Sequence, residues 1–286
     1  MIEPREKPEP AAVARHYDAL DPFYREVWGR DLHHGYWKTG RETVAEAVGN
    51  LTAAAADLAR VASGDRVCDI GCGYGGTSLW LAEHRGADVT GYTLSRHQAE
   101  SAASAAARLP GSLPRPRFLC RDWLENGLPD GSADAVLSIE CFSHVDDKAA
   151  FFREIARVLK PGGRVGMTAW LARERPRPWE VRHLLEPICR EGRLAGLVDL
   201  SELREFAESA GLVVDDLRDI GPRVGKTWRV IVKRLAVKLA TRPDYRAYLR
   251  DERNGDRVFA LTVLRLAAAY LTRSMGYGLL GARRPQ

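Results

Sequence analysis

Hydrophobic and polar positions repeat along the chain in a strand–helix order from Asp65 onward. Short apolar runs, typical of buried strands, are separated by stretches with an apolar residue every three or four positions, typical of helices. The runs predict strands at 66–70, 87–92, 116–120, 133–139 and after Gly163, with helices at 76–85, 96–108 and 147–159. This order predicts a doubly wound, mostly parallel α/β sheet of the Rossmann-like kind, which binds ligands at the carboxyl ends of its strands.

The segments that flank this core read mainly as helices. A helix at 201–210, with Ser201 at its N-cap position, and a strand at 212–219 follow the core. Residues 224–275 predict an insertion of amphipathic helices before a last strand, "MGYGLLGARRP", which completes a seven-stranded sheet. We therefore expect four parts: an N-terminal helical cap (1–60), the core (61–220), a helical lid insertion (221–275) and the last core strand (276–286).

Composition indicates a globular protein and narrows its setting. The chain has 286 residues, of which 45% are apolar, enough for a sizeable core. No stretch approaches the roughly 20 uncharged apolar residues of a membrane span, and the N-terminus has no apolar signal region. The five cysteines form no C-x-x-C pair, so we expect a reducing, cytoplasmic setting and no metal site. The net charge of +5 is mild, so we expect no nucleic-acid partner and no stable membrane insertion, with a homodimer left open.

A glycine-rich turn, "DIGCGYGG", follows the first core strand and indicates a nucleotide-containing cofactor. Gly71, Gly73 and Gly76 fit the dinucleotide fingerprint, which is a weak signal alone. Asp69, two residues before the first glycine, would repel a pyrophosphate but attract the ammonium and sulfonium groups of S-adenosylmethionine (SAM). The Asp-x-Gly-x-Gly-x-Gly form, which includes Gly75, therefore favours SAM. A nicotinamide dinucleotide and a tight turn without a ligand are the alternatives.

A second candidate cofactor contact follows the third core strand. Asp122 and Trp123 stand where an adenine would lie. The carboxylate could accept from the exocyclic amine, and the indole could cover the ring. The alternative for Asp122 is an ordinary N-cap that faces solvent.

These motifs resemble those of the class I SAM-dependent methyltransferases. Within them, the chain is similar to the gamma-tocopherol methyltransferase-like group, which includes bacterial natural-product enzymes such as rifamycin O-methyltransferases. The resemblance covers nearly the whole chain and also rests on "HYDALDPFYREVWGRDLHHGYW", "GYTLSRHQ", "IECFSHVDD" and "ARVLKPGGRV". In this group a T-x-S-x-x-Q pattern replaces the usual ribose-binding acid, and Thr93, Ser95 and Gln98 fit it. Their hydroxyls and amide can satisfy a ribose diol without a charge, although Ser95 could instead be only a helix N-cap.

The fourth core strand ends in "SIECFSHVDD", which carries the candidate catalytic residues Glu140 and His144. This end lacks the [DN]PP[FYW] and Pro-Cys signatures of nucleic-acid methyltransferases, and its E-x-x-x-H spacing resembles that of sterol and tocopherol C-methyltransferases. Methyl transfer is an in-line displacement, so the protein orients the acceptor and removes its proton. For Glu140 the alternative is a structural hydrogen bond to the N-terminal helices. For His144 it is a loop cap or a contact to the cofactor.

Aromatic residues are dense in the N-terminal segment and recur in the predicted lid. The resemblance places Tyr17 near the sulfonium of SAM, where an aromatic face suits a cation. Trp37 and Trp228 are candidate substrate contacts, with packing in the core or on the outer helices as the alternative. We expect a SAM-dependent methyltransferase of an apolar small molecule of phenolic, terpenoid or polyketide type, with oxygen slightly favoured over carbon. The alternatives are a cyclase of this fold that binds SAM without transferring methyl, and a peripheral membrane protein with basic helices at 226–240.

Overall fold

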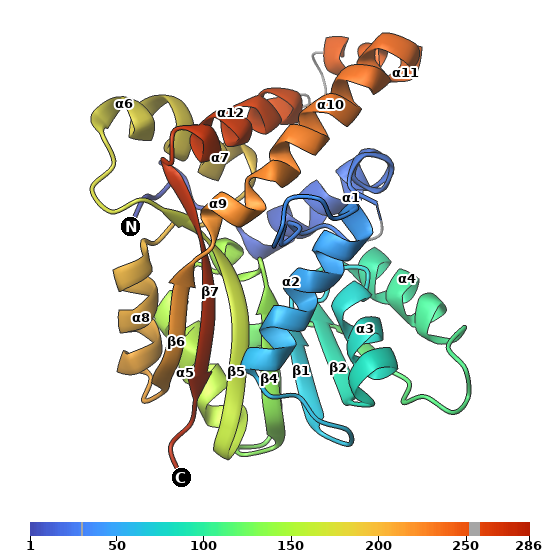
Figure 1. The fold of residues 1–286 in the computed structure, drawn as a ribbon, viewed down its shortest axis with the longest axis vertical. Coiled ribbons are helices and arrows are strands. Elements are labelled where there is room, and N and C mark those ends of the chain that lie inside the picture. Colours follow the sequence, from blue (N-terminus) through green and yellow to red (C-terminus); the bar gives the residue numbers. More distant parts are fainter. Residues whose placement is uncertain (30, 252–257) are drawn as a thin grey trace.

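The computed structural model describes residues 1–29, 31–251 and 258–286, and within them seven strands form one sheet (Figure 1). Their order is β3-β2-β1-β4-β5-β7-β6, in which β7 runs antiparallel to both of its neighbours and the five strands from β3 to β5 are parallel. The strands are β1 (Arg66–Ile70), β2 (Asp88–Thr93), β3 (Arg117–Cys120), β4 (Ala133–Ile139), β5 (Leu159–Ala172), β6 (Val213–Asp219) and β7 (Met275–Arg283). The predicted Rossmann-like α/β sheet is confirmed, and its strand order reverses between β1 and β4, where a crevice opens.

Helices cover both faces of the sheet and its carboxyl edge. They are α1 (Pro10–Val27), α2 (Val44–Leu58), α3 (Gly76–Arg85), α4 (Arg96–Ala106), α5 (Lys148–Val158), α6 (Pro178–Glu180), α7 (Glu186–Glu191), α8 (Leu200–Ser209), α9 (Gly221–Val224), α10 (Lys226–Thr241), α11 (Pro243–Arg250) and α12 (Phe259–Leu271). Short 3₁₀ turns lie at Trp123–Glu125 and Phe142–His144, and a π-helical turn lies at Val181–Leu185. None of the helices that the structure describes is long and apolar enough to cross a membrane.

The alternation of side chains along each strand divides the core between the two faces of the sheet. On one face, Leu51 and Ala55 of α2 and Leu81 of α3 pack on alternate residues of β1, β2 and β4. On the other face, Phe151 of α5 and Leu203 of α8 pack on the remaining alternate residues. The two helices of residues 1–60 therefore differ in position, because α2 belongs to a core layer whereas α1 lies over the carboxyl edge (Figure 1).

Two local predictions are corrected by the structure. The N-cap of α8 is Asp199, whose carboxylate accepts from the amide of Glu202, while the Glu202 side chain accepts from the amide of Asp199. Ser201 was the wrong residue because the complete capping box begins two positions earlier. Helix α5 ends at Val158, and β5 begins directly at Leu159, whereas the sequence predicts a helix to residue 159 and a strand only after Gly163.

Helices from distant parts of the chain meet above the carboxyl ends of the parallel strands. Helix α1, the α6–α7 excursion after β5 and the insertion between β6 and β7 lie there together (Figure 1). The insertion consists of α9 to α12, and its residues 252–257 lie outside the described part of the chain. These helices form the roof of the cavity described next.

Candidate active site

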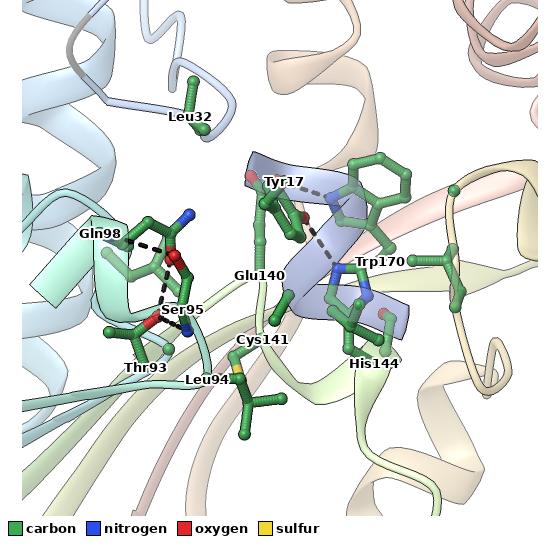
Figure 2. Close-up of a pocket in the computed structure, with 18 of the residues that line it drawn as sticks. Tyr17, Leu32, Thr93, Leu94, Ser95, Gln98, Glu140, Cys141, His144 and Trp170 are labelled. Atoms are coloured by element: carbon green, nitrogen blue, oxygen red, sulfur yellow. Dashed lines mark hydrogen bonds between the residues drawn. The ribbon is translucent and has the colours of Figure 1, made fainter. Parts of the chain in front are cut away.

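A cavity of about 170 Å³ lies at the carboxyl ends of β1, β2 and β4, beneath the helices of the roof. Its floor comes from the glycine turn after β1 and from the ends of β2 and β4, and its walls come from α1, α7, α10 and α12 (Figure 2). Apolar side chains dominate this lining, and the polar ones come from a few positions. An apolar pocket with few convergent polar groups is typical of a small-molecule site.

The glycine turn needs glycine at three positions for steric reasons. Gly71, Gly73 and Gly75 have φ angles of +71°, +52° and +82°, in the left-handed region that disfavours other residues. A Cβ at Gly71 would lie 2.5 Å from the Cβ of Cys141, two residues after the end of the neighbouring strand β4. A Cβ at Gly75 would lie 2.8 Å from the ring of Phe118. Gly71 and Gly73 line the cavity, whereas Gly75 caps α3.

Two carboxylates flank this turn. Asp69 is buried beneath it, where its Oδ2 accepts a 2.6 Å hydrogen bond from Ser78 Oγ. Burial raises the pKa of Asp69 to about 6, although Ser78 and His33 act in the opposite direction. The Asp31 carboxylate lies at the N-terminus of α3, where a Cβ on Gly76 would overlap it. Its buried Oδ1 has no hydrogen-bond partner in the described part of the chain. This pair of carboxylates fits a cationic ligand and opposes a pyrophosphate at the same helix end.

The predicted ribose-binding residues Thr93, Ser95 and Gln98 lie together on the cavity wall (Figure 2). Thr93 Oγ1 donates to Gln98 Oε1 at 2.6 Å. Ser95 is also the N-cap of α4, because its Oγ accepts from the amide of Gln98 at 3.0 Å. The Ser95 hydroxyl donates to the carboxylate of Asp18 in α1 at 2.5 Å. A carboxylate from α1 therefore lies beside the end of β2, where the strand itself lacks the usual ribose-binding acid. No local pattern around β2 indicates Asp18, because this residue lies on a separate helix.

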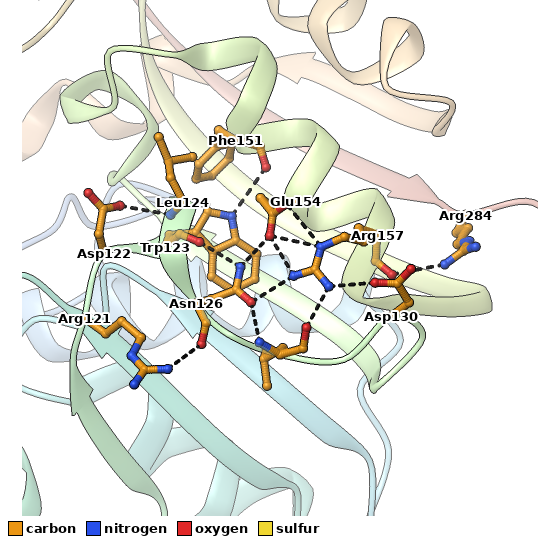
Figure 3. Close-up of polar contacts among 11 residues, drawn as sticks. Arg121, Asp122, Trp123, Leu124, Asn126, Asp130, Phe151, Glu154, Arg157 and Arg284 are labelled. Atoms are coloured by element: carbon orange, nitrogen blue, oxygen red, sulfur yellow. Dashed lines mark hydrogen bonds and ion pairs between the residues drawn. The ribbon is translucent and has the colours of Figure 1, made fainter.

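Trp123 does not line the cavity, and Figure 3 shows the contacts of its indole. Its indole is buried in the core, in edge contact with Tyr92, and its N–H donates to the carbonyl of Phe151 at 3.4 Å. Asp122 caps the 3₁₀ turn by accepting from the amide of Leu124 at 2.9 Å. This is the N-cap role that was the alternative to an adenine contact. The Asp122 carboxylate nevertheless acts electrostatically on Cys141, which lines the cavity. Burial, with the negative charges of Asp122 and Asp69, raises the pKa of the Cys141 thiol to about 12.

Polar contacts around Glu154 hold the chain that follows Trp123. Asn126 Nδ2 donates to Glu154 at 2.7 Å, and the Arg157 guanidinium donates to the same carboxylate at 2.7 Å (Figure 3). Arg157 also pairs with Asp130, at 2.7 Å. This network ties the loop between β3 and β4 to α5, so the position of Trp123 is set by the core rather than by a ligand.

Glu140 lies at the end of β4 with a φ angle of +60° and is buried among donors. Its Oε1 accepts from the His34 amide, His34 Nδ1 and the Tyr277 hydroxyl at 2.7, 2.8 and 2.6 Å. Its Oε2 accepts from the Trp170 indole at 2.7 Å. Burial alone would raise the pKa of Glu140, but His34 and Tyr277 outweigh it and lower the pKa to about 2. Both oxygens of this carboxylate already accept hydrogen bonds from the protein, and the geometry favours the structural alternative for Glu140.

His144 and Tyr17 form the second polar group of the cavity (Figure 2). His144 Nδ1 lies 2.9 Å from the Arg193 carbonyl, which can only accept, so Nδ1 carries the proton. His144 Nε2 is therefore the acceptor of the 3.0 Å hydrogen bond from the Tyr17 hydroxyl. Burial lowers the pKa of His144 to about 4, so the imidazole is neutral at ordinary pH. Burial also raises the pKa of Tyr17.

The two predicted substrate residues have different positions. Trp228 is 1% exposed and lines the cavity. Its ring makes edge contacts with Trp28 and Trp170, with ring centroids 5.3 and 5.8 Å apart. Trp37 lies outside the cavity, where its indole N–H donates to Thr227 Oγ1 at 3.1 Å and the Lys226 ammonium lies 4.1 Å above its ring. The structure therefore brings Trp228 to the site but assigns Trp37 to packing.

Known proteins resemble the chain over nearly its full length. A family model described as "Methyltransferase domain" matches residues 68–167. The chain is 31% identical to 27-O-demethylrifamycin SV methyltransferase of Amycolatopsis mediterranei over 280 residues, which cover 98% of this chain and 99% of that relative. The chain belongs to the class I SAM-dependent methyltransferases. The predicted family and enzyme class are confirmed, and SAM is the cofactor of this methyltransferase.

Solved structures agree with this fold. The structure of the [4+2]-cyclase SpnF aligns with a TM-score of 0.78 and 28% sequence identity. The alignment covers 100% of this chain and 99% of the cyclase. The mycolic acid cyclopropane synthase CmaA1, solved with SAH and CTAB, has a TM-score of 0.84 and covers 98% of this chain and 99% of its own. At 22% identity, that second likeness shows the fold alone.

Proposed function

We propose that this methyltransferase transfers the methyl group of SAM to an oxygen of an apolar small molecule, of phenolic, terpenoid or polyketide type. The observation that carries the proposal is the hydrogen-bonded pair of Tyr17 and His144 within an otherwise apolar cavity. An oxygen acceptor loses a proton when it is methylated, and this pair can take it. The rifamycin relative, whose name describes an O-demethylated substrate, supports oxygen over carbon.

The geometry of the pair supports a short proton path. The Arg193 carbonyl keeps the Nδ1 proton of His144 in place, so Nε2 presents its lone pair to Tyr17. An acceptor hydroxyl that donates to the Tyr17 oxygen could pass its proton through the phenol to Nε2. The low pKa of His144 leaves Nε2 unprotonated at neutral pH, and this weak base would take the proton as the new bond to the methyl group makes the acceptor oxygen strongly acidic. When bound, SAM supplies the electrophilic methyl group, and the cavity walls orient the acceptor and exclude water.

We propose that the cofactor is held by residues of the glycine turn and of the β2 end: Asp69, Gly71, Gly73, Gly75, Thr93, Ser95 and Gln98. The carboxylates at the turn suit the amino and sulfonium groups, and the hydroxyl and amide groups suit a ribose. Asp122 stays in the proposed set because its carboxylate lies near the cavity wall at Cys141. Trp123 could contribute only its backbone without a change in its packing.

We further propose that α1 and the insertion of residues 221–275 act as a lid. Tyr17 of α1, Trp228 of α10 and Leu266 of α12 line the same cavity. The bond from Ser95 to Asp18 ties α1 across the ribose-binding residues. A lid of this kind excludes water and selects the acceptor by shape.

Incubation of the protein with isotopically labelled SAM and extracts of apolar metabolites tests the activity. We expect S-adenosylhomocysteine to accumulate with a product that is heavier by one labelled methyl group, bound to oxygen. The likeness to SpnF keeps a second function in view, a cyclisation within the same cavity. A product of unchanged mass, formed without S-adenosylhomocysteine, would support that cyclase instead.

The raised pKa of Asp69 leads us to expect that the affinity for SAM depends on pH. The pKa of this carboxylate is raised to about 6 in the unliganded protein, so it is largely neutral below that pH and ionised above it. Because only the ionised form attracts a cation, we expect the dissociation constant of SAM to rise as the pH falls below 6. Calorimetry across pH 5 to 8 measures this, and Asp69→Asn should bind more weakly with a flat profile. An Asp69→Asn variant with the affinity and pH profile of the parent would contradict the assignment.

A further inference from the structure

The outer face of α12 is apolar although it faces solvent. Leu261, Leu264 and Leu271 are 53%, 53% and 86% exposed, and their spacing places them on one side of the helix. The opposite side buries Val263 and Leu266. A surface helix normally carries polar residues on its solvent side, so a row of exposed leucines marks a surface that contacts something else.

An open groove lies beside this face, between the end of α12, α9 and the start of α10. Leu271 forms part of its wall, together with four cationic side chains: Arg173, Lys226, Arg229 and Arg273. Arg173 pairs with Glu180, and Lys226 donates to the Gly40 carbonyl. Arg229 and Arg273 are exposed, and their guanidinium groups have no ion-pair or hydrogen-bond partner among the residues that the structure describes.

The charge of this region is positive because its basic residues outnumber its acidic ones. Helix α10 has five Lys or Arg residues and no Asp or Glu, and α12 has no Asp or Glu either. Asp219 lines the groove, but its Oδ1 accepts from the amides of Gly221 and Tyr277 at 2.7 and 3.0 Å. Glu174 accepts from Ser201 Oγ at 3.0 Å. Arg229 and Arg273 are therefore left to act on an external anion.

The same helices separate this surface from the cavity. Thr262 and Leu266, on the inner side of α12, line the cavity, as does Trp228 of α10. The exposed leucines lie on the outer side of α12, one helix thickness away. A partner on the outer face would therefore sit directly above the roof of the site.

We propose that Leu261, Leu264, Leu271, Arg229 and Arg273 form a docking surface for an anionic lipid bilayer. Exposed leucines beside unpaired arginines match the acyl chains and anionic headgroups of a membrane interface. A soluble polyanion would use the arginines but not the row of leucines. Docking on this surface is peripheral, and it is independent of the proposed methyl transfer.

Sedimentation of the full chain with vesicles tests the surface without SAM or substrate. We expect binding to phosphatidylcholine vesicles that contain phosphatidylglycerol, little binding to pure phosphatidylcholine, and loss of binding at high salt. Removing a cation at a membrane surface weakens partitioning about fivefold, so Arg229→Glu with Arg273→Glu should weaken it by at least about 25-fold. Leu264→Ser with Leu271→Ser should also weaken binding strongly.

Matched controls change the same chemistry elsewhere. Arg108→Glu with Arg115→Glu makes the same change of net charge at exposed positions next to β3, and Val213→Ser removes an exposed apolar side chain from β6. Both controls should bind vesicles like the parent. Equal binding to both kinds of vesicle, or equal losses in controls and surface variants, would overturn the proposal. If only the arginine variant lost vesicle binding, the surface would bind anions without inserting leucines into the lipid, and this result would also overturn the proposal.

Discussion

Replacing Tyr17 with phenylalanine is expected to lower kcat by about 10²- to 10⁴-fold, the range for loss of a proton-transfer group. The substitution removes only the hydroxyl that donates to His144 Nε2, so the ring and its packing remain. SAM affinity should therefore change little. Single-turnover kinetics with an identified acceptor, together with SAM calorimetry, separate these two effects.

The same measurement on two further variants completes the test. His144→Ala should lower kcat as strongly as Tyr17→Phe, and the double variant should lose little more, because the two residues act as one unit. Tyr36→Phe is the matched control, since Tyr36 is buried in the same N-terminal segment and does not line the cavity. Normal turnover in both Tyr17→Phe and His144→Ala would mean that the reaction proceeds by orientation alone.

Replacing Glu140 with alanine is expected to destabilise the protein by at least about 3 kcal/mol, because each buried donor left without an acceptor costs about 1–3 kcal/mol. The substitution leaves the donors of His34, Trp170 and Tyr277 without their acceptor in a buried site. Chemical denaturation measures the change in the free energy of unfolding. Glu83→Ala, at an exposed position of α3, should change it only slightly.

The lowered pKa of Glu140 also leads us to expect a loss of stability in acid. Its pKa is lowered to about 2 in the folded protein, from an ordinary value of 4.5. A lowered pKa contributes stability that is complete above pH 4.5 and is lost as the pH falls toward 2. The free energy of unfolding should therefore depend less on pH over this window in Glu140→Gln than in the parent. Identical pH dependence in the two proteins would show that Glu140 titrates normally.

The sheet could be predicted from the sequence because each buried strand is a short apolar run of its own. The predicted 66–70 and 133–139 match β1 and β4 residue for residue, and the glycine turn stands where the pattern placed it. The N-cap of α8 could not be placed as well, because Asp199 and Ser201 are both good capping residues, and only the reciprocal bond to Glu202 distinguishes them.

The roles of the site residues depend on contacts between distant segments, which no local pattern contains. Glu140 reads as a candidate base from its place at a strand end, yet its partners come from positions 34, 170 and 277. Trp123 follows β3 as expected, but the packing of the loop against α5 turns its ring into the core. The E-x-x-x-H spacing marks a strand end whose Glu140 and His144 both line the cavity, and the proposal made above takes His144 rather than Glu140 as the proton acceptor.

The carboxylates around the glycine turn have a consequence for turnover. Methyl transfer converts the sulfonium of the cofactor into a neutral thioether, so the product carries one positive charge fewer than SAM. With Asp69 and Asp31 at the cofactor, as proposed, part of their attraction would come from that charge and would weaken at the moment of reaction. We therefore expect these two carboxylates to hold the spent cofactor less tightly than SAM.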